Sequence, residues 1–447
     1  MERTQRLTAR AAVGAVLALA VAGCGFLPSP TQEAAAVTAT PSALRTTTPA
    51  PLPLTTPEPT PTLPTGPTLS WTPVLASNGN AKLAPKLAGG ISAALAFPGG
   101  FVLAGSNSLG HAIVWFSPDG TKWQPIENVP GFEDGVIRNL VPLPEGLLAN
   151  LVPTPGGLLA VGTAQKVDSL CAGAALGCNP IAPIRFWTST DGLDWRPLPS
   201  TVAAPFGRAQ MDQIVPGPSG LVAFGELVPA TGTNITGMVW TSPDGRVWTR
   251  APQFPTAFPT DTIADLAAGP GGYAAVGSRS VGGNLTQSRR AWYSVDGRTW
   301  QRASGPGAQG PTVVMTCEGG FFGVDSPSGQ ATFWTSADGV NWRVQPAVVG
   351  RPNYPAYVGS GLYSDGTRIL AMGADSFQTR GAWLSTDGLE WQPIVLSGGQ
   401  PPTDSAVIGS VVGTLGPKGA IVTTATQTSA GSPTWTVWFG TLSQQPS

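Results

Sequence analysis

The chain has 447 residues, including 58 glycines and 46 prolines, and only 11% of its residues are charged, with a net charge of −1. This composition favours a turn-rich β protein over a helical one. The near-neutral charge argues against a nucleic-acid surface, which needs clustered Lys and Arg. The single histidine, His111, excludes a multi-histidine metal site, and the sequence has no phosphate loop or dinucleotide fingerprint.

The N-terminus has the pattern of an export signal. Three arginines in the first ten residues precede an uncharged apolar run from Ala11 to Ala22, which is too short to span a bilayer. The run ends in VAGC, with Cys24 last, and resembles the lipobox of bacterial lipoproteins. The resemblance implies that residues 1–23 are a signal peptide and that a lipid on Cys24 anchors the protein outside the cytoplasmic membrane. A plain secretory signal with a chance cysteine is the alternative.

Residues 24–68 form a second segment, dominated by Thr and Pro. The segment has almost no charge and no apolar periodicity, so it cannot bury a core and is expected to be an extended tether rich in polyproline II. In the remaining chain, Cys171 and Cys178 lie seven residues apart in a loop of small residues, and export predicts a disulfide between them. Cys317 lies in an apolar stretch and is expected to be a buried free thiol.

The motif Trp-x-Ser-x-Asp-Gly-x-x-Trp recurs through the rest of the chain. Its six copies are Trp115–Trp123, Trp187–Trp195, Trp240–Trp248, Trp292–Trp300, Trp334–Trp342 and Trp383–Trp391. The turn aspartates are Asp119, Asp191, Asp244, Asp296, Asp338 and Asp387. In the first copy we predict a β-hairpin with a three-residue loop and Gly120 in the left-handed region, which pairs Ser117 with Thr121 and Trp115 with Trp123. The motif is interpreted as structural rather than ligand-binding.

A second hairpin, with a Pro/Gly turn and a nearly continuous apolar strand, precedes each motif and occurs seven times. Such strands fit positions that are buried on both faces. The seventh unit lacks its last strand, and Ser70–Val74 (SWTPV) can supply it. The sequence therefore predicts an all-β fold, a seven-bladed β-propeller of four-stranded blades over residues 69–447, closed by an N-terminal strand. The segments Leu140–Asn150 and Leu151–Val161 are duplicates, and either could form the blade strand.

The Ser-x-Asp-Gly-x-x-Trp hairpins resemble the Asp-box (BNR) repeats of sialidases and related propellers. The resemblance covers most of Ser70–Phe439 as repeats, but the usual box is one residue longer, and it implies a blade hairpin without a catalytic residue. A sialidase-like site also implies an arginine before the first box, and no arginine lies between Ser70 and Ile137. Tyr354 and Tyr357 are expected in a loop without a nearby glutamate, so the sequence disfavours sialidase chemistry.

Strand alternation predicts that the two short turns of each blade share one face and that the longer, variable loops share the other. Function usually depends on variable loops over a rigid scaffold. The candidate ligand contacts on the variable face are Arg279, Arg289, Arg290, Arg351, Asn353, Tyr354, Tyr357, Asp375 and Arg380. Acids outside the boxes could converge at the axis or could be solvated loop residues; they are Glu133, Asp134, Asp168, Asp212, Asp261, Asp265, Asp375 and Asp404.

The sequence favours a binding or scaffold module for protein or carbohydrate. A glycan-cleaving hydrolase and an assembly factor for an envelope complex are the alternatives, because a fold alone does not determine function. We expect no catalytic residue, no metal, no cofactor and no nucleic-acid partner. The expected partners are the membrane, through the lipid, and a protein or glycan, and the protein is expected to be a monomer.

Overall fold

Residues Gly66–Ser447 form one compact unit. The computed structural model describes residues 67–76, 90–107, 109, 111–133, 150–154, 157–164, 181–231, 236–252, 261–281, 284–304, 310–325, 331–346, 352, 354–355, 361–374, 380–399, 412–427 and 433–443. The predicted signal peptide, the Thr/Pro segment up to residue 66, Cys24, and the pair Cys171 and Cys178 lie outside these residues. In the described part of the chain, no helix is long and apolar enough to cross a membrane.

Five sheets each contain four antiparallel strands in chain order. The first sheet has β2 (Gly90–Phe97), β3 (Gly100–Ser106), β4 (Ala112–Ser117) and β5 (Gln124–Ile126). The second sheet has β6 (Asn150–Thr154), β7 (Gly157–Thr163), β8 (Ile184–Ser189) and β9 (Trp195–Pro197). The third sheet follows the 3-10 helix η3 (Ser200–Phe206) and has β10 (Ala209–Gly217), β11 (Gly220–Leu227), β12 (Thr236–Ser242) and β13 (Thr249–Arg250).

The fourth and fifth sheets repeat this order. The fourth sheet has β14 (Asp261–Gly269), β15 (Gly272–Val281), β16 (Asn284–Ser294) and β17 (Gln301–Arg302). The fifth sheet has β18 (Val313–Cys317), β19 (Gly320–Asp325), β20 (Thr332–Ser336) and β21 (Arg343–Val344). The predicted all-β class is therefore confirmed.

The last sheet has nine strands, in the order β22-β24-β25-β26-β1-β29-β28-β27, with β23 paired to β24. Its first strands are β22 (Tyr354–Pro355), β23 (Leu362–Ser364), β24 (Ile369–Ala374), β25 (Arg380–Ser385) and β26 (Gln392–Gly398). The others are β27 (Gly413–Gly416), β28 (Gly419–Gln427), β29 (Pro433–Ser443) and the N-terminal β1 (Thr68–Ala76). β1 is antiparallel to β29 and parallel to β26, so both of its edges are paired.

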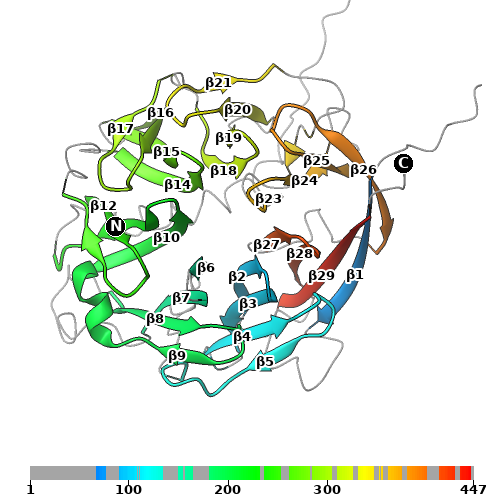
Figure 1. The fold of residues 1–447 in the computed structure, drawn as a ribbon, viewed down its shortest axis with the longest axis horizontal. Helices are drawn as coiled ribbons and strands as arrows, with labels where there is room; N and C mark the ends of the chain where they lie inside the picture. The colour runs from blue at the N-terminus through cyan, green and yellow to red at the C-terminus, as the bar shows by residue number, and fades with distance from the viewer. Residues whose placement is uncertain are drawn as a thin grey trace, which may run out of the picture. The chain divides into compact units, whose positions relative to one another are not determined.

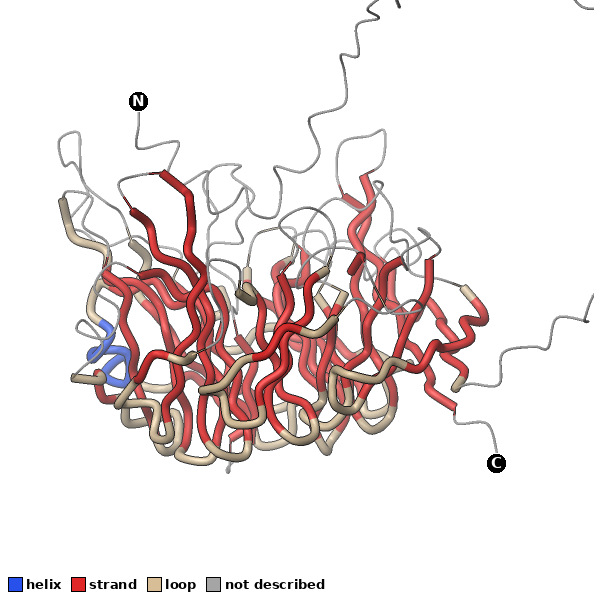
Figure 2. Tube along the Cα trace, turned by 90° about the horizontal axis from the view of Figure 1, so that it is seen from above, coloured by secondary structure: helices blue, strands red, loops and turns tan. Residues whose placement is uncertain are grey.

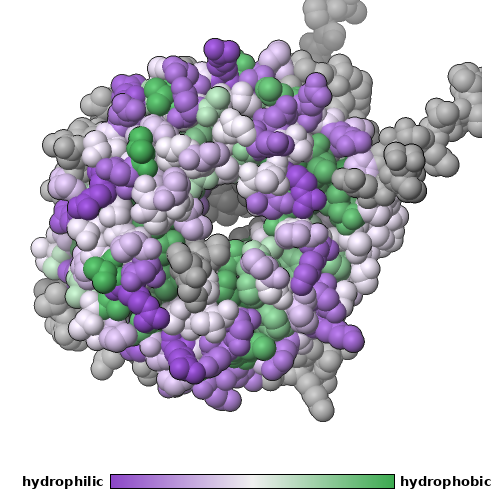
Figure 3. Space-filling view, in the orientation of Figure 1, coloured by the Kyte–Doolittle hydropathy of each residue, from purple (hydrophilic) through white to green (hydrophobic). Residues whose placement is uncertain are grey.

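Figure 1 shows the sheets of this unit arranged around a central axis, with the first strand of each four-stranded sheet innermost and the last at the rim. The architecture is that of a β-propeller. Viewed along the axis, hydrophilic side chains cover much of the rim, and the surface is hollowed at the centre (Figure 3).

The second strand of each sheet is buried on both faces, as its apolar sequence predicts. All seven residues of β3 are buried. Val102 packs in a cluster with Leu158 of the second sheet, while the next residue, Leu103, packs with Ile421 and Phe439 of the nine-stranded sheet. Successive side chains of a strand point to opposite faces, so one apolar strand contributes to the core on both sides of its sheet.

Two sequence expectations about strand identity are answered by the pairing. The second copy of the duplication supplies β6 and β7, with Leu151 opposite Ala160, while residues 140–149 lie outside the described residues. In the N-terminal segment, Pro73 lies opposite Trp438, just as Pro125 lies opposite Trp115 in the first sheet. The SWTPV segment thus pairs with β29 as the last strand of a four-stranded sheet pairs with the third.

Candidate functional site

The hairpin of the Trp-x-Ser-x-Asp-Gly-x-x-Trp motif has a longer loop than the sequence predicts. Trp115 lies opposite Pro125 and the neighbouring residue Phe116 opposite Gln124, so the predicted pairs of Trp115 with Trp123 and of Ser117 with Thr121 are wrong. The left-handed conformation of Gly120 is confirmed by its φ of 83°. The prediction failed because it treated the aspartate as an ordinary turn residue, whereas its side chain organises the whole loop.

One carboxylate oxygen closes each loop. Oδ1 of Asp119 accepts hydrogen bonds from the backbone N–H of Thr121 at 2.8 Å and of Lys122 at 3.0 Å. The Ser117 hydroxyl donates to the same oxygen at 3.2 Å and accepts from the Gly120 N–H at 2.8 Å. These backbone hydrogen bonds favour the ionised carboxylate and lower the pKa of Asp119 to about 2.

The same bonds recur in the other five copies. Each turn aspartate accepts from the N–H groups two and three residues after it. The second Trp of every copy donates its indole N–H to the carbonyl of the box glycine. The turn aspartate and the second tryptophan of each motif therefore bond within the loop, which accounts for the motif as a structural element.

The box glycine packs directly against the preceding sheet. A Cβ placed on Gly388 would lie 2.3 Å from Phe322 of β19, and one on Gly297 would lie 2.3 Å from Val222 of β11. On Gly120 it would lie 2.5 Å from Phe439 of β29. Glycine is needed here both for the positive φ and for this close approach between neighbouring sheets.

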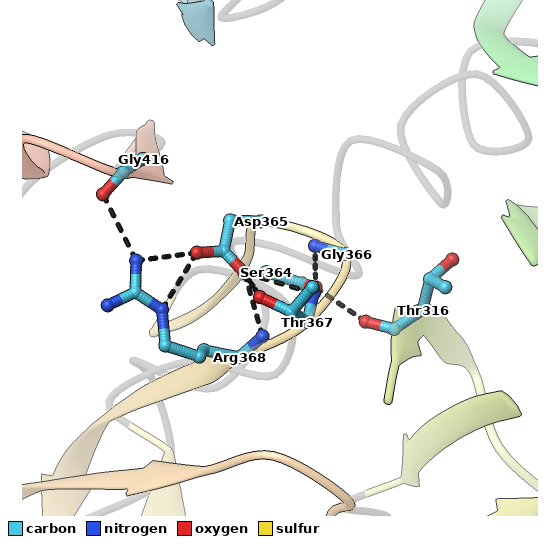
Figure 4. Close-up of polar contacts among 7 residues, drawn as sticks. All are labelled: Thr316, Ser364, Asp365, Gly366, Thr367, Arg368 and Gly416. Carbon is cyan, nitrogen blue, oxygen red and sulfur yellow. Dashed lines mark hydrogen bonds and ion pairs between the residues drawn. The ribbon is translucent and has the colours of Figure 1, made fainter. Parts of the chain in front are cut away.

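The turn between β23 and β24 uses the same chemistry to connect three neighbouring segments (Figure 4). Asp365 Oδ1 accepts from the Thr367 and Arg368 backbone N–H groups at 3.0 and 2.7 Å. Its other oxygen binds the Arg368 guanidinium at 2.9 and 2.7 Å, and that guanidinium also donates to the Gly416 carbonyl of β27. On the other side, the Ser364 hydroxyl donates to the Thr316 carbonyl of β18.

Both kinds of short turn lie at one end of the sheets, as strand alternation predicts. Phe101, which follows the first turn, pairs with Ser117, which precedes the box loop, and a Cβ on Gly100 would lie 2.2 Å from the Ser117 carbonyl oxygen. Figure 2 shows the described short loops gathered along one edge of the ring. We call this edge the box end. We call the opposite edge, where the second strand of each sheet connects to the third, the loop end.

The predicted ligand contacts of the fourth sheet lie on strands rather than in a loop. Arg279 belongs to β15, Arg289 and Arg290 belong to β16, and the pairing extends to Val281 opposite Asn284. The sequence places these arginines among the variable loops, and that expectation is wrong, because the two strands extend as a long hairpin at the loop end. Its register places Arg279 opposite Ser288, one residue before Arg289.

The remaining predicted contacts belong to the nine-stranded sheet. Tyr354 lies in β22, and its expected position in a loop is wrong. The backbones of Tyr354 and Arg380 flank Ala374 on its two sides, so three adjacent strands bring them to the same end of the sheet. Arg351, Asn353, Tyr357 and Asp375 lie outside the described residues.

The loop end also contains a charged pair between two sheets that the sequence reasoning missed. Asp325, the last residue of β19, is buried, with 4% of its surface exposed. Its Oδ1 lies 3.5 Å from Nη2 of Arg289 in the fourth sheet and accepts a hydrogen bond from the Thr312 hydroxyl at 3.1 Å. The signal was present in the repeats: this position is glycine at the end of FVLAG, LLAVG, LVAFG, YAAVG and ILAMG, and aspartate in FFGVD.

A second acid, Asp265, joins the inner strands of neighbouring sheets. It lies in β14 rather than in a solvated loop. Its two oxygens accept from the backbone N–H groups of Leu266 at 2.9 Å and of Val314 in the fifth sheet at 2.8 Å. Gln213 of the third sheet binds the N–H and the carbonyl of Leu266, both at 3.1 Å. Burial raises the pKa of Asp265 to about 6, and we assign the residue a structural role because both oxygens hold backbone groups.

His111 belongs to a third charged group at the loop end, where the first and second sheets meet. Glu133 accepts a hydrogen bond from the Gly131 N–H at 3.0 Å. Backbone hydrogen bonds lower the pKa of Glu133, with a smaller contribution from the charges of Arg185 and His111. The Trp187 indole donates to the Pro130 carbonyl at 3.1 Å and fixes the chain that carries Glu133.

The expected buried free thiol is confirmed for Cys317, which is 4% exposed. Burial raises the pKa of this thiol to about 11, so it is protonated at neutral pH and a poor nucleophile. The described residues contain no group of three or more His, Cys, Asp or Glu side chains that could hold a metal ion.

Comparisons with known proteins give no family assignment. No family model matches the chain, and no curated protein matches it. Among solved structures, a protein of unknown function from Dyadobacter fermentans is 15% identical, with a TM-score of 0.38 over 66% of this chain and 93% of that chain. A mutant Trypanosoma rangeli sialidase with trans-sialidase activity is 12% identical, with a TM-score of 0.40 over 78% of this chain.

A PL25 ulvan lyase, bound to a GlcA–Rha3S saccharide, is 10% identical, with a TM-score of 0.43 over 77% of this chain and 90% of that chain. The alignment covers 53% of the sialidase, so this chain spans about half the length of that protein. The β-propeller architecture of this chain follows from its own strand pairing.

Proposed function

We propose that this protein is a lipid-anchored, extracytoplasmic binding module that recognises carbohydrate at the loop end of a seven-bladed propeller. Five blades are the four-stranded sheets, and the nine-stranded sheet supplies two more that meet at β26 and β1. In this proposal β22–β26 form the sixth blade, and β27–β29 with β1 form the seventh. The pairing of Pro73 with Trp438 supports ring closure by the N-terminal strand.

The proposed anchor is a lipid on Cys24, joined to β1 by the Thr/Pro segment. Export would also permit the proposed Cys171–Cys178 disulfide. Replacing Cys24 with Ser tests the anchor: we expect the protein to leave the membrane fraction and appear in the soluble extracytoplasmic fraction. Retention of the Cys24→Ser protein on the membrane would contradict the proposal.

The observation that carries the binding proposal is the difference between the two ends of the sheets. At the box end, the aspartates, the serines and the indole of the second tryptophan in the motif bond to their own loops. At the loop end, the connections vary in length, and third strands of three sheets carry arginines, namely Arg185, Arg289, Arg290 and Arg380. Irregular, charged connections on a rigid scaffold are a common location for binding sites.

Polarity favours carbohydrate over a protein partner at the loop end. Among the described residues, four of the six exposed large apolar side chains that a protein interface would cover are in box-end loops, namely Leu193, Val247, Val295 and Leu389, while Leu109 lies at the loop end. Described side chains at the loop end include Arg185, Arg289 and Arg290, with Glu133 and Asp325. Such donors and acceptors match the hydroxyl groups of sugars.

An array of glycans and cell-wall fragments, probed with the full chain, tests this proposal. We expect saturable binding to one sugar class, weakened by Arg290→Ala at the loop end. Arg298→Ala, in the box loop of the same sheet, is the matched control and should bind as the wild type does. Absence of binding across the array, or equal loss in both variants, would contradict recognition at the loop end.

A further inference from the structure

We propose that Asp325 and Arg289 form a subsite for two adjacent hydroxyl groups of a neutral sugar, at the boundary of the fourth and fifth sheets. This inference rests on the proposed carbohydrate binding and names the chemistry of one part of the site. It starts from the one repeat in which a buried acid replaces glycine.

The other sheets show why glycine is the ordinary residue at this position. A Cβ on Gly105 would lie 2.0 Å from the Gly90 carbonyl oxygen, and one on Gly225 would lie 2.1 Å from the Gln210 carbonyl oxygen. In those sheets a β-bulge in the innermost strand brings the backbone over the glycine. The backbone of these two sheets leaves no space for a side chain there.

The fifth sheet has an aspartate at this position. The regular pairing of its inner strand ends at Val313, opposite Val324. Thr312 then donates its backbone N–H to the Val324 carbonyl at 2.9 Å and its hydroxyl to Asp325. The Thr312 hydroxyl thus holds the carboxylate that replaces the glycine, although a buried charge is costly to accommodate.

The carboxylate has one oxygen that the described residues do not use. Its side chain is only 6% exposed, and that of Arg289 is 21% exposed. Thr312 and Arg289 both bind Oδ1, while no described residue donates to Oδ2. Unlike the enclosed indole nitrogen of Trp115, Oδ2 is not fully buried, so a hydroxyl donor from outside the protein can reach it.

The charges of Asp325 and Arg289 determine which kind of ligand can supply that donor. A cationic donor would be repelled by the Arg289 guanidinium, and an anionic ligand would be repelled by the Asp325 carboxylate. A neutral sugar avoids both penalties: one hydroxyl donates to Asp325 Oδ2 while the neighbouring oxygen accepts from Arg289. Charge-assisted hydrogen bonds of this kind are about twice as strong as neutral ones.

Calorimetric titration of the full chain with mannotriose, galactotriose, cellotriose and chitotriose tests the subsite. Asp325→Asn keeps the shape of the side chain but replaces the acceptor Oδ2 with an N–H donor. We expect this variant to bind the preferred saccharide roughly tenfold more weakly. Asp194→Asn is the matched control, since it changes an exposed acid paired with Arg196 at 2.6 Å in a box loop, and should leave the Kd unchanged.

The outcomes separate the two proposals. Wild-type binding with an unchanged Kd in Asp325→Asn would overturn the subsite and leave carbohydrate binding standing. No wild-type binding to these saccharides or to the glycan array would overturn both. If Asp325→Asn does not fold, Thr312→Val replaces it, because losing the hydroxyl that orients Asp325 should also weaken binding, and an unchanged Kd there would overturn the subsite.

Discussion

The box end of the sheets and the regions away from the box loops both use aspartates, but these aspartates have different partners. At the box end, Asp119 and its equivalents hold the backbone of their own exposed loops, and the same bonds recur in six copies. Away from the box loops, Asp265 and Asp325 are enclosed between sheets, and each occurs once. Repetition at the box end maintains the fold, whereas the two single acids differ from each other: Asp265 holds backbone groups, and Asp325 belongs to the proposed subsite.

The largest expected effect concerns the packing of a box glycine on the preceding sheet. Gly388→Ala adds a Cβ at a φ of 74° and only 2.3 Å from Phe322, so strain and overpacking combine. We expect a loss of about 3 kcal/mol in the free energy of unfolding. Gly319→Ala, at a φ of 85° with no atom within 4 Å of the new Cβ, should lose only about 1 kcal/mol. Equal losses in denaturant titrations would contradict the packing role.

Removing an acid should cost more between sheets than in a box loop. Asp265→Ala leaves the Val314 N–H without its acceptor at the boundary of two sheets, and should reduce the unfolding free energy by about 1–3 kcal/mol. In Asp119→Ala, water can replace the carboxylate, so we expect a loss below about 1 kcal/mol. Denaturant midpoints of the two variants check this order, and a larger loss in Asp119→Ala would reverse the comparison.

The two kinds of acid should also give stability opposite dependences on pH. The pKa of Asp119 falls from 3.8 to about 2 on folding, so its stabilising contribution is present above pH 4 and is lost as the pH falls toward 2. The pKa of Asp265 rises from 3.8 to about 6, so the folded state binds the proton more tightly. Its contribution is therefore full below pH 4 and is lost as the pH rises through 6.

Urea unfolding of the wild type at pH values from 2 to 7 measures both slopes. Asp119→Asn should flatten the dependence between pH 2 and 4, and Asp265→Ala should flatten it between pH 4 and 6. The change in pH dependence caused by Asp119→Asn is expected to be the smallest effect predicted here, because only one of several similar loops is changed. A wild-type curve that rises steadily from pH 4 to 7, unaltered by Asp265→Ala, would exclude the assigned role of Asp265.

Periodicity made the β-propeller architecture predictable, because each repeat contains the same apolar strand and the same Asp-Gly turn. The pairing of the SWTPV segment with β29 could be inferred because Trp71 and Pro73 match Trp123 and Pro125. The register of the box hairpin could not be inferred from the sequence. It depends on a side-chain carboxylate that replaces backbone contacts across the loop.

The candidate site was predictable only in part. Arg289 and Arg290 were singled out as charged residues at the loop end, but their strands extend further than the polar sequence suggests. Asp325 was missed because an acid at the end of an apolar strand looks like a surface residue until its partners in two other strands are known. Comparing the repeats position by position would have identified it as the acid that replaces glycine.

Hydrogen–deuterium exchange of the full chain, with and without the saccharide that binds best, tests the central claim most directly. We predict that the ligand slows exchange at the loop end of the fourth and fifth sheets, around Arg289 and Asp325, and leaves the six box loops unchanged. Protection confined to the box loops, with none at the loop end, would contradict the division of the molecule into a structural end and a binding end.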